Sequence, residues 1–347
     1  MSMSKIIENE RDFFEPVITW VKEVTKSGVV YTHNGCFHAD ETSVVAFLRI
    51  FGFEGIVKRV SDVPSEAAGS LIFDIGGGKF DHHQPDAEIR TFPWEQPVRI
   101  KYAAFGLIVR ESGILDLNGF DRWDEFFVSR LDAADNGEGP GTDWGYTIKA
   151  LNPSYYDSDP QIEAAQFEVA INFMRVVIEA EIKKNLDFIT AANEMSWYNY
   201  CDEDGKHTGE TDAGERFLIL DRGVFPWKPF CKGKNKAVAV IAPSNRDLGY
   251  YNVLVNTGYI ISRALYINKA DVPEISFIHD SLFIAVTKDL ETAIKICKHW
   301  VVNELDDEPS VDKHFRFDPD EPEEERCYND CSQCNHRKYC TEYRLLA

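Results

Sequence analysis

The chain has 347 residues, which is more than one hydrophobic core usually serves, so we expect two domains. Its hydrophobic fraction of 44% and charged fraction of 27% are those of a folded globular protein, and they exclude wholesale disorder and fibrous classes. The 37 basic and 58 acidic residues give a net charge of −21, which argues against binding of nucleic acid through a broad basic face. An acidic enzyme can still act on phosphates, because bound divalent cations reverse the sign of an acidic cleft.

The first residues, MSMSKIIENERD, lack the apolar region of a secretory signal. No apolar run approaches the roughly 18 residues of a membrane span. We therefore expect a cytoplasmic protein with no membrane partner.

Three short β-rich runs, at residues 28–33, 55–60 and 70–75, alternate with segments that carry helical apolar spacing from Glu41 onward. This alternation predicts an α/β domain with a largely parallel sheet. Ligands of such sheets gather beyond the carboxyl ends of the strands, where His33, Asp74 and His82 are expected to lie.

Two helices are expected at residues 101–113 and 124–135, and residues 161–193 favour one long helix or a helical pair. Strand patterns return from residue 216 and end in a helix near residues 290–300, which predicts a second, smaller α/β domain. Residues 304–326 have the acidic, proline-containing composition of a linker. The expected organisation comprises a metal-binding catalytic domain at 1–155, a helical connector at 156–215, a substrate-binding α/β domain at 216–303, an acidic linker at 304–326 and a cysteine-cluster tail at 327–347.

The first domain is rich in potential metal ligands. Four of the nine histidines fall between residues 33 and 83, together with several aspartates at predicted strand ends. A buried aspartate such as Asp74 is costly without a cation or hydrogen bonds. Imidazole with carboxylate suits manganese, iron, zinc or, with fewer histidines, magnesium. The three glycines at residues 76–78 are better explained by a tight turn that brings Asp74 and His82 together than by a phosphate cradle.

Four ordered segments resemble the melanocyte-proliferating-gene (MYG) nuclease family of the DHH phosphoesterase superfamily: THNGCFHADE, FDIGGGKFDHHQ, KYAAFGLIVRESG and LDAADNG. The resemblance implies a DHH-phosphoesterase-like parallel-sheet domain with two divalent metal ions, manganese being expected and magnesium an alternative. It assigns as metal ligands His33, His38, Asp40, Asp74, His82 and Asp135. Asp74 would bridge the two ions.

The resemblance also implies further roles. His83 would contact phosphate or act in acid/base chemistry beside Asp81, and Lys101 would bind substrate. In the second domain, the expected substrate-binding residues are His279, Arg263 and Arg222. The glycine-containing loop that follows this histidine in the family is replaced by Asp280-Ser281-Leu282, which leaves a different substrate open.

The expected reaction is metal-dependent phosphodiester hydrolysis, by a 3′-to-5′ exonuclease that acts on single-stranded RNA or DNA through two metal ions. A small-molecule phosphohydrolase acting on a nucleotide, an oligonucleotide or pyrophosphate is the first alternative, which the −21 charge favours. A non-catalytic protein that binds nucleic acid or a partner through its tail is the second. A homo-oligomer is compatible with each of them.

The tail carries the spacing C-x3-C-x2-C-x5-C, formed by Cys327, Cys331, Cys334 and Cys340. Four thiolates so close together can hold a zinc ion or a [4Fe-4S] cluster, and the spacing does not separate the two. Four unrelated reduced thiols are the structural alternative.

Overall fold

A computed structural model describes residues 4–84, 87–90, 100–120, 123–138, 142–154, 159–200, 206–223, 226–227, 230–231, 237–255, 263–265 and 272–303. The chain forms two compact units, with the boundary between Glu194 and Met195. The expected acidic linker and cysteine tail lie outside the described residues.

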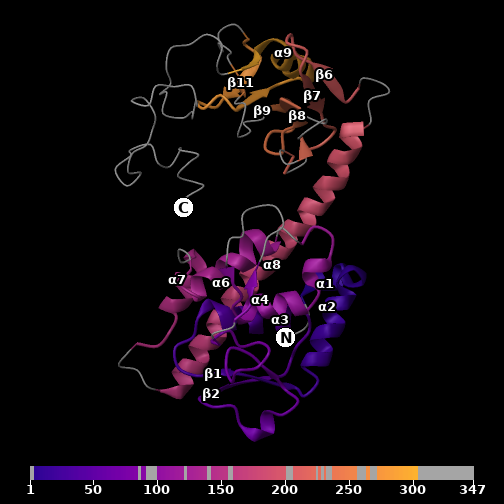
Figure 1. The fold of residues 1–347 in the computed structure, drawn as a ribbon. Helices are drawn as coiled ribbons and strands as arrows, with labels where there is room; N and C mark the ends of the chain where they lie inside the picture. Colours follow the sequence, from indigo (N-terminus) through magenta and orange to yellow (C-terminus); the bar gives the residue numbers. More distant parts are fainter. Residues whose placement is uncertain are drawn as a thin grey trace, which may run out of the picture. The chain divides into compact units, whose positions relative to one another are not determined.

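The first unit contains helices and strands in this order: α1 (Lys5–Asn9), α2 (Arg11–Val24), β1 (Val29–His33), α3 (Ala39–Ile50), β2 (Ile56–Val60), η1 (Ser65–Ala67), β3 (Leu71–Ile72), β4 (Ile89–Arg90), β5 (Ile100–Lys101), α4 (Ala104–Glu111), η2 (Ile114–Asp116), the π-helical η3 (Asp124–Val128), α6 (Ser129–Asp135), α7 (Asp143–Ala150) and most of α8 (Pro160–Tyr200). Helices and strands alternate in the first part of this unit, as Figure 1 shows.

A three-stranded parallel sheet lies in this unit, in the order β2-β1-β3. The register pairs Val29 with Ile56 and His33 with Val60, so β1 and β2 end at the same edge. The predicted parallel sheet is therefore confirmed in this unit. Its strand ends place polar side chains at one edge, where a metal centre can form.

Helix α3 is the central helix of the first unit, where it contacts α4, α6 and α7. Its buried positions include the apolar run from Val44 to Leu48, which explains why it lies inside the core. The same burial takes Asp40 and Glu41, in its first turn, away from water. A buried carboxylate is costly unless it is hydrogen-bonded or lies beside a cation, so Asp40 and Glu41 both require such partners.

Residues 160–200 of the predicted connector at 156–215 form the single helix α8, and strand β6 (Thr208–Glu210) also lies within that range. Residues in the first half of α8, among them Phe167, Ile171 and Met174, are buried in the core of the first unit. This half of the helix therefore belongs to the packing of the first unit.

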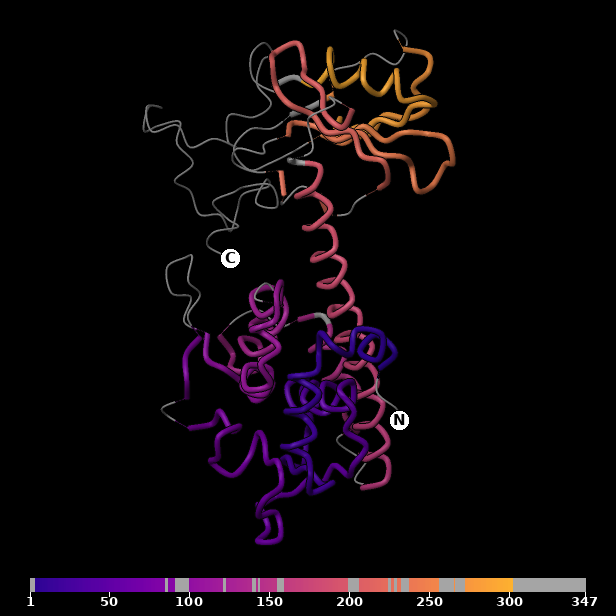
Figure 2. The backbone as a smooth tube through the Cα atoms, turned by 90° about the vertical axis from the view of Figure 1, so that its right-hand side faces the viewer, coloured from indigo at the N-terminus to yellow at the C-terminus, as the bar shows by residue number. Residues whose placement is uncertain are grey.

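The second unit has these further elements: β6 (Thr208–Glu210), β7 (Arg216–Ile219), β8 (Ala239–Pro243), β9 (Tyr251–Val255), β10 (Arg263–Leu265), β11 (Ile275–Ile278), β12 (Ile284–Thr287), α9 (Leu290–Trp300) and β13 (Val301–Asn303). Its main sheet has the order β11-β12-β9-β8-β7-β6, and only β7 and β8 pair in parallel. Helix α9 lies against this sheet (Figure 2). Its residues Ala293, Ile296 and Cys297 are buried in the core of the unit. Among the described residues, the unit combines helix α9 with a mostly antiparallel sheet.

Among the residues that the structure describes, no helix combines the length and apolar character that a membrane crossing requires.

Candidate metal centre

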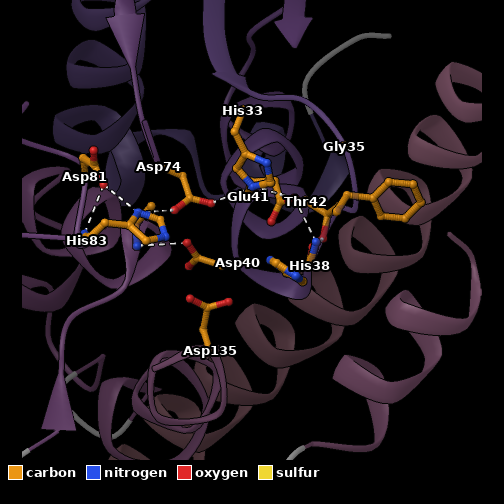
Figure 3. Close-up of polar contacts among 12 residues, drawn as sticks. His33, Gly35, His38, Asp40, Glu41, Thr42, Asp74, Asp81, His83 and Asp135 are labelled. Carbon is orange, nitrogen blue, oxygen red and sulfur yellow. Dashed lines mark hydrogen bonds and ion pairs between the residues drawn. The ribbon is translucent and has the colours of Figure 1, made fainter. Parts of the chain in front are cut away.

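A polar cavity of about 860 Å³ lies at the carboxyl edge of the parallel sheet. Carboxylates and imidazoles from several separate segments point toward one another there, as Figure 3 shows for Asp40, Asp74 and Asp135. The lining residues are His33, His38, Ser61, Asp74, Ile75, Gly76, Asp81, His82, His83, Gln84, Lys101, Asp135 and Asn136.

A glycine turn brings two of these segments together. Gly76 and Gly77 have φ angles of 88° and 69°, a conformation that glycine adopts without a steric penalty. The chain then returns so that the N–H of Asp74 donates to the carbonyl of Phe80 at 2.9 Å. The predicted geometric role of this turn is confirmed, because His82 lies against Asp74.

Asp74 lies between two histidines. Its Oδ2 is 3.2 Å from Nε2 of His33, and its Oδ1 is 3.1 Å from Nε2 of His82. Burial alone would raise the pKa of Asp74, but hydrogen bonds from His33 and His82 lower it to about 2. The side chain is therefore an ionised carboxylate that presents one oxygen to each side, as a bridging ligand does.

Both histidines have a hydrogen-bond acceptor at Nδ1. Nδ1 of His33 is 2.9 Å from the carbonyl of Asn34, and Nδ1 of His82 is 3.1 Å from Oδ1 of Asn136. Since these partners accept hydrogen bonds, a ring whose Nε2 binds a cation would keep its hydrogen on Nδ1. In both rings Nε2 is the nitrogen that faces Asp74.

The carboxylates favour positive charge at both rings. Hydrogen bonds with Asp74 and Glu41 raise the pKa of His33 to about 11. Burial opposes charge on His82, yet hydrogen bonds with Asp135 and Asp74 raise its pKa to about 11 as well. The site thus attracts protons or other cations at the two Nε2 positions.

Asp135 and Asp40 complete the side of the centre around His82. Oδ2 of Asp135 is 3.2 Å from Nε2 of His82, and ligand atoms of these two residues and Asp40 lie within 4.8 Å of one another. The buried Asp40 also accepts the N–H groups of Ala104 and Phe105, at 3.0 and 2.7 Å, at the start of α4. Burial and the charges of Asp135 and Asp74 raise the pKa of Asp40, a penalty that a bound cation would remove.

His38 and Glu41 lie on the His33 side. One potential ligand atom from each of His33, His38 and Glu41 lies within 4.8 Å of the other two. Oε1 of Glu41 is 3.3 Å from Nε2 of His33. All six predicted ligands are thus brought together in space, and Glu41 joins them. Glu41 was not among the ligands predicted from the sequence, although its position directly after Asp40 in the first turn of a buried helix was a usable signal.

Residues outside the recognised segments hold the loop between His33 and His38. The side-chain amide of Asn152 accepts the N–H of Phe37 at 2.8 Å and donates to its carbonyl at 2.7 Å. Arg59 donates to the carbonyl of Gly35 at 2.6 Å, pairs with Glu163 and lies over the ring of Phe167. Such long-range contacts fix the loop, and nothing in the local sequence indicates them.

Asp81 and His83 form a pair at the rim of the cavity. Oδ1 of Asp81 is 2.8 Å from Nδ1 of His83 and accepts its backbone N–H at 3.1 Å, and Oδ2 accepts the N–H of Gly77 at 2.7 Å. The hydrogen bond from Gly77 and those with His83 outweigh burial and lower the pKa of Asp81. His83 is 63% exposed, so its ring is accessible to a substrate. Lys101 lines the same cavity, with Nζ 3.8 Å from Glu138.

The three substrate-binding residues predicted for the second half belong to the second unit. Nδ1 of His279 accepts the N–H of Ser281 at 3.0 Å, and its ring packs against Phe283. Arg222 follows β7 in the sequence, and Arg263 begins β10. Cys327, Cys331, Cys334 and Cys340 lie outside the described residues.

The donor set fits divalent cations. Imidazole nitrogens and carboxylate oxygens are the ligands of manganese, iron and zinc, and the carboxylates also suit magnesium. The buried Oε2 of Glu41 has no hydrogen-bond partner within the described part of the chain. Two imidazoles that face one carboxylate from opposite sides allow two cations to share Asp74.

Residues 29–241 match the model of the MYG1 exonuclease family, described as an uncharacterised protein family (UPF0160). The chain is 28% identical over 239 residues to the MYG1 exonuclease of Bos taurus. The matched region covers 57% of this chain and 59% of that protein. It is 26% identical over 234 residues to the MYG1 exonuclease of Homo sapiens, with 57% and 60% covered. The matches thus span about three fifths of these relatives.

Among solved structures, the crystal structure of RecJ in complex with Mg²⁺ from Thermus thermophilus aligns with 82% of this chain and 50% of that chain. The sequence identity is 12% and the TM-score is 0.20, which is too low to indicate a shared fold.

Proposed function

The chain belongs to the MYG1 exonuclease family, and from that membership and the geometry of the centre we propose that it is a metal-dependent phosphodiesterase of the DHH type. Its proposed reaction is 3′-to-5′ exonucleolytic hydrolysis of single-stranded RNA or DNA. The observation that carries the proposal is the position of Asp74, which offers one oxygen toward His33 and the other toward His82.

The proposed metal ligands are His33, His38, Asp40, Asp74, His82 and Asp135. Two divalent ions, manganese by preference, would lower the pKa of a water molecule and stabilise charge on the attacking and leaving oxygens. The protein's contribution is to hold the imidazoles with Nε2 inward, through Asn34 and Asn136. It also supplies the carboxylates of Asp40, Asp74 and Asp135, which would offset most of the positive charge of two divalent cations.

Proton transfer and phosphate binding are assigned to the rim. Asp81 orients His83 through Nδ1, so that its accessible ring can contact a phosphate oxygen or give a proton to the leaving oxygen. Lys101 lines the same cavity and offers positive charge to a phosphate. His279, Arg222 and Arg263 are proposed to bind the remainder of the substrate, and the cysteines of the tail to hold zinc or a [4Fe-4S] cluster.

A second candidate is a phosphohydrolase that acts on nucleotides, short oligonucleotides or pyrophosphate. The net charge of −21 favours it, because a long polyanion is repelled by an acidic protein surface except where cations are bound. Both candidates use the same centre and differ in the length of the substrate.

The experiment is a parallel digestion, with manganese, of end-labelled RNA, single-stranded DNA and dinucleotides by the wild type and His82→Ala. His299→Ala, which changes an exposed histidine of the second unit, is the matched control. We expect the wild type and His299→Ala to shorten the labelled strands from the 3′ end, and His82→Ala to lose this activity. Cleavage of dinucleotides alone would support the second candidate, and equal cleavage by His82→Ala would refute the assignment of the centre.

A further inference from the structure

Glu41 has a carboxylate whose burial is unexplained by its protein contacts. The residue is 0% exposed, and its Oε1 accepts the backbone N–H of His38 at 2.8 Å as part of a capping box. Its Oε2 is buried and has no hydrogen-bond partner among the described residues. An anionic oxygen in such a position is costly unless a cation lies beside it.

The surroundings of Glu41 supply the other ligands that a cation needs. Oε1 lies 3.3 Å from Nε2 of His33, the nitrogen that also faces Oδ2 of Asp74. His38 offers a second imidazole, and its ligand atom lies within 4.8 Å of those of His33 and Glu41. Nitrogen and oxygen donors therefore surround one point on this side of Asp74.

The other side of Asp74 has a different composition. The carboxylates of Asp40 and Asp135 lie within 4.8 Å of the buried imidazole of His82, and ligand atoms of His83 and Asp74 also lie within 4.8 Å of that of His82. The exposed His83 is held by Asp81 through Nδ1. This side is accordingly dominated by oxygen.

We infer that Glu41 is a metal ligand and that the centre consists of two chemically unlike cation sites that share Asp74. The nitrogen-rich site comprises His33, His38 and Glu41. The carboxylate-rich site comprises Asp40, His82 and Asp135. The inference rests on the metal-binding part of the proposed function and goes beyond it, because it adds a ligand and separates the two sites by metal preference.

The donor sets decide that preference. Imidazole favours manganese and later transition ions over magnesium, whereas a carboxylate-rich site accepts magnesium and manganese alike. The nitrogen-rich site is therefore selective for a transition ion. The carboxylate-rich site exchanges readily with magnesium.

Substitution of Glu41 separates its ligand role from its capping role. Glu41→Gln keeps a side-chain oxygen that accepts the N–H of His38, but it removes the negative charge. Asp124→Asn is the matched control, because Asp124 is a buried carboxylate whose cation is Arg90, with Nε 2.8 Å away. Bound Mn²⁺ is counted by electron paramagnetic resonance of the free ion in a titration without substrate.

We expect two Mn²⁺ ions per chain for the wild type and for Asp124→Asn. In Glu41→Gln one ion should bind as before, and the other at least about tenfold more weakly. Two ions bound by Glu41→Gln with unchanged affinity would overturn the ligand role. A wild type that binds no Mn²⁺ would instead refute the metal centre itself and with it the proposed function.

A competition on the unaltered protein tests the difference between the sites even if Glu41→Gln fails to fold. With two Mn²⁺ ions bound, magnesium should release one at a concentration at least about tenfold lower than the other. Release of both ions over the same magnesium range would overturn the inference of unlike sites. This measurement requires no catalytic activity.

Discussion

Asn136 is predicted to set metal affinity without being a ligand. Its Nδ2 donates to the carbonyls of Asp132 and Lys101, at 2.9 and 3.2 Å, which fixes the orientation of the amide. Oδ1 consequently faces Nδ1 of His82 at 3.1 Å and holds the ring with Nε2 toward Asp74. Replacement by alanine removes the acceptor that selects this tautomer.

The magnitude follows from this position. Loss of a partner that orients a metal-binding histidine typically weakens metal affinity 10- to 100-fold, or about 1.4–2.8 kcal/mol. The three hydrogen bonds of Asn136 contribute about 0.5–1.5 kcal/mol each, so their loss should also reduce the free energy of unfolding by about 1.5–4.5 kcal/mol. Asn136→Ala should therefore lower both Mn²⁺ affinity and stability, whereas a hydrogen bond lost away from the centre should lower stability alone.

Isothermal titration with Mn²⁺ and urea unfolding measure the two quantities. The control is Asn172→Ala, since Asn172 makes the same type of bond to the carbonyl four residues earlier, at 2.9 Å, on helix α8. We expect this control to bind Mn²⁺ as the wild type does. If Asn136→Ala also keeps wild-type affinity, the argument from the His82 tautomer is refuted.

Three further predictions concern loop positioning, packing and protons. Asn152→Ala should lower the free energy of unfolding by about 1–3 kcal/mol and weaken the binding of one of two Mn²⁺ ions, because it releases the loop between His33 and His38. Unchanged urea unfolding and an unchanged Mn²⁺ titration would contradict this prediction. Gly106→Ala should lower the free energy of unfolding in urea by about 3 kcal/mol or more, because the new Cβ would clash with Oδ2 of the buried Asp132. A decrease below about 1 kcal/mol would show that helix α4 shifts to relieve the clash. In the folded protein the pKa values of His33 and His82 are raised to about 11, whereas in the unfolded chain they are about 6.5. Without metal, the stability that the two charged rings contribute is therefore fully present below about pH 6.5 and is lost as the pH rises toward 11. Metal binding near neutral pH should then release protons from both rings, as seen by calorimetry in buffers of different ionisation enthalpy, and an absence of proton release would contradict the raised pKa values.

Local patterns were sufficient to predict the framework of the centre. The β-rich runs of the first half became parallel strands, and their carboxyl ends brought His33 and Asp74 to one edge. The glycine run was expected to act as a turn, and its positive φ angles fulfil that role. These features depend on residues that are close in sequence, which explains why periodicity and spacing indicated them.

Features that depend on distant contacts were not predictable in this way. The contact of Asn152 with Phe37 joins residues that are 115 positions apart, and no local pattern indicates it. Glu41 completes a capping box at the start of α3, and only the burial of that helix leaves its second oxygen without a partner among the described residues. The strand patterns of the second unit were visible, but their mostly antiparallel pairing follows from tertiary register rather than from composition.

The central claim is that Asp74 is shared by two cations, and anomalous diffraction at the manganese edge from crystals soaked in Mn²⁺ tests it most directly. We expect two anomalous peaks, one within about 2.3 Å of each carboxylate oxygen of Asp74, with Nε2 of His33 beside one peak and Nε2 of His82 beside the other. A single peak, or none near Asp74 in a crystal that contains the ordered first unit, would contradict it.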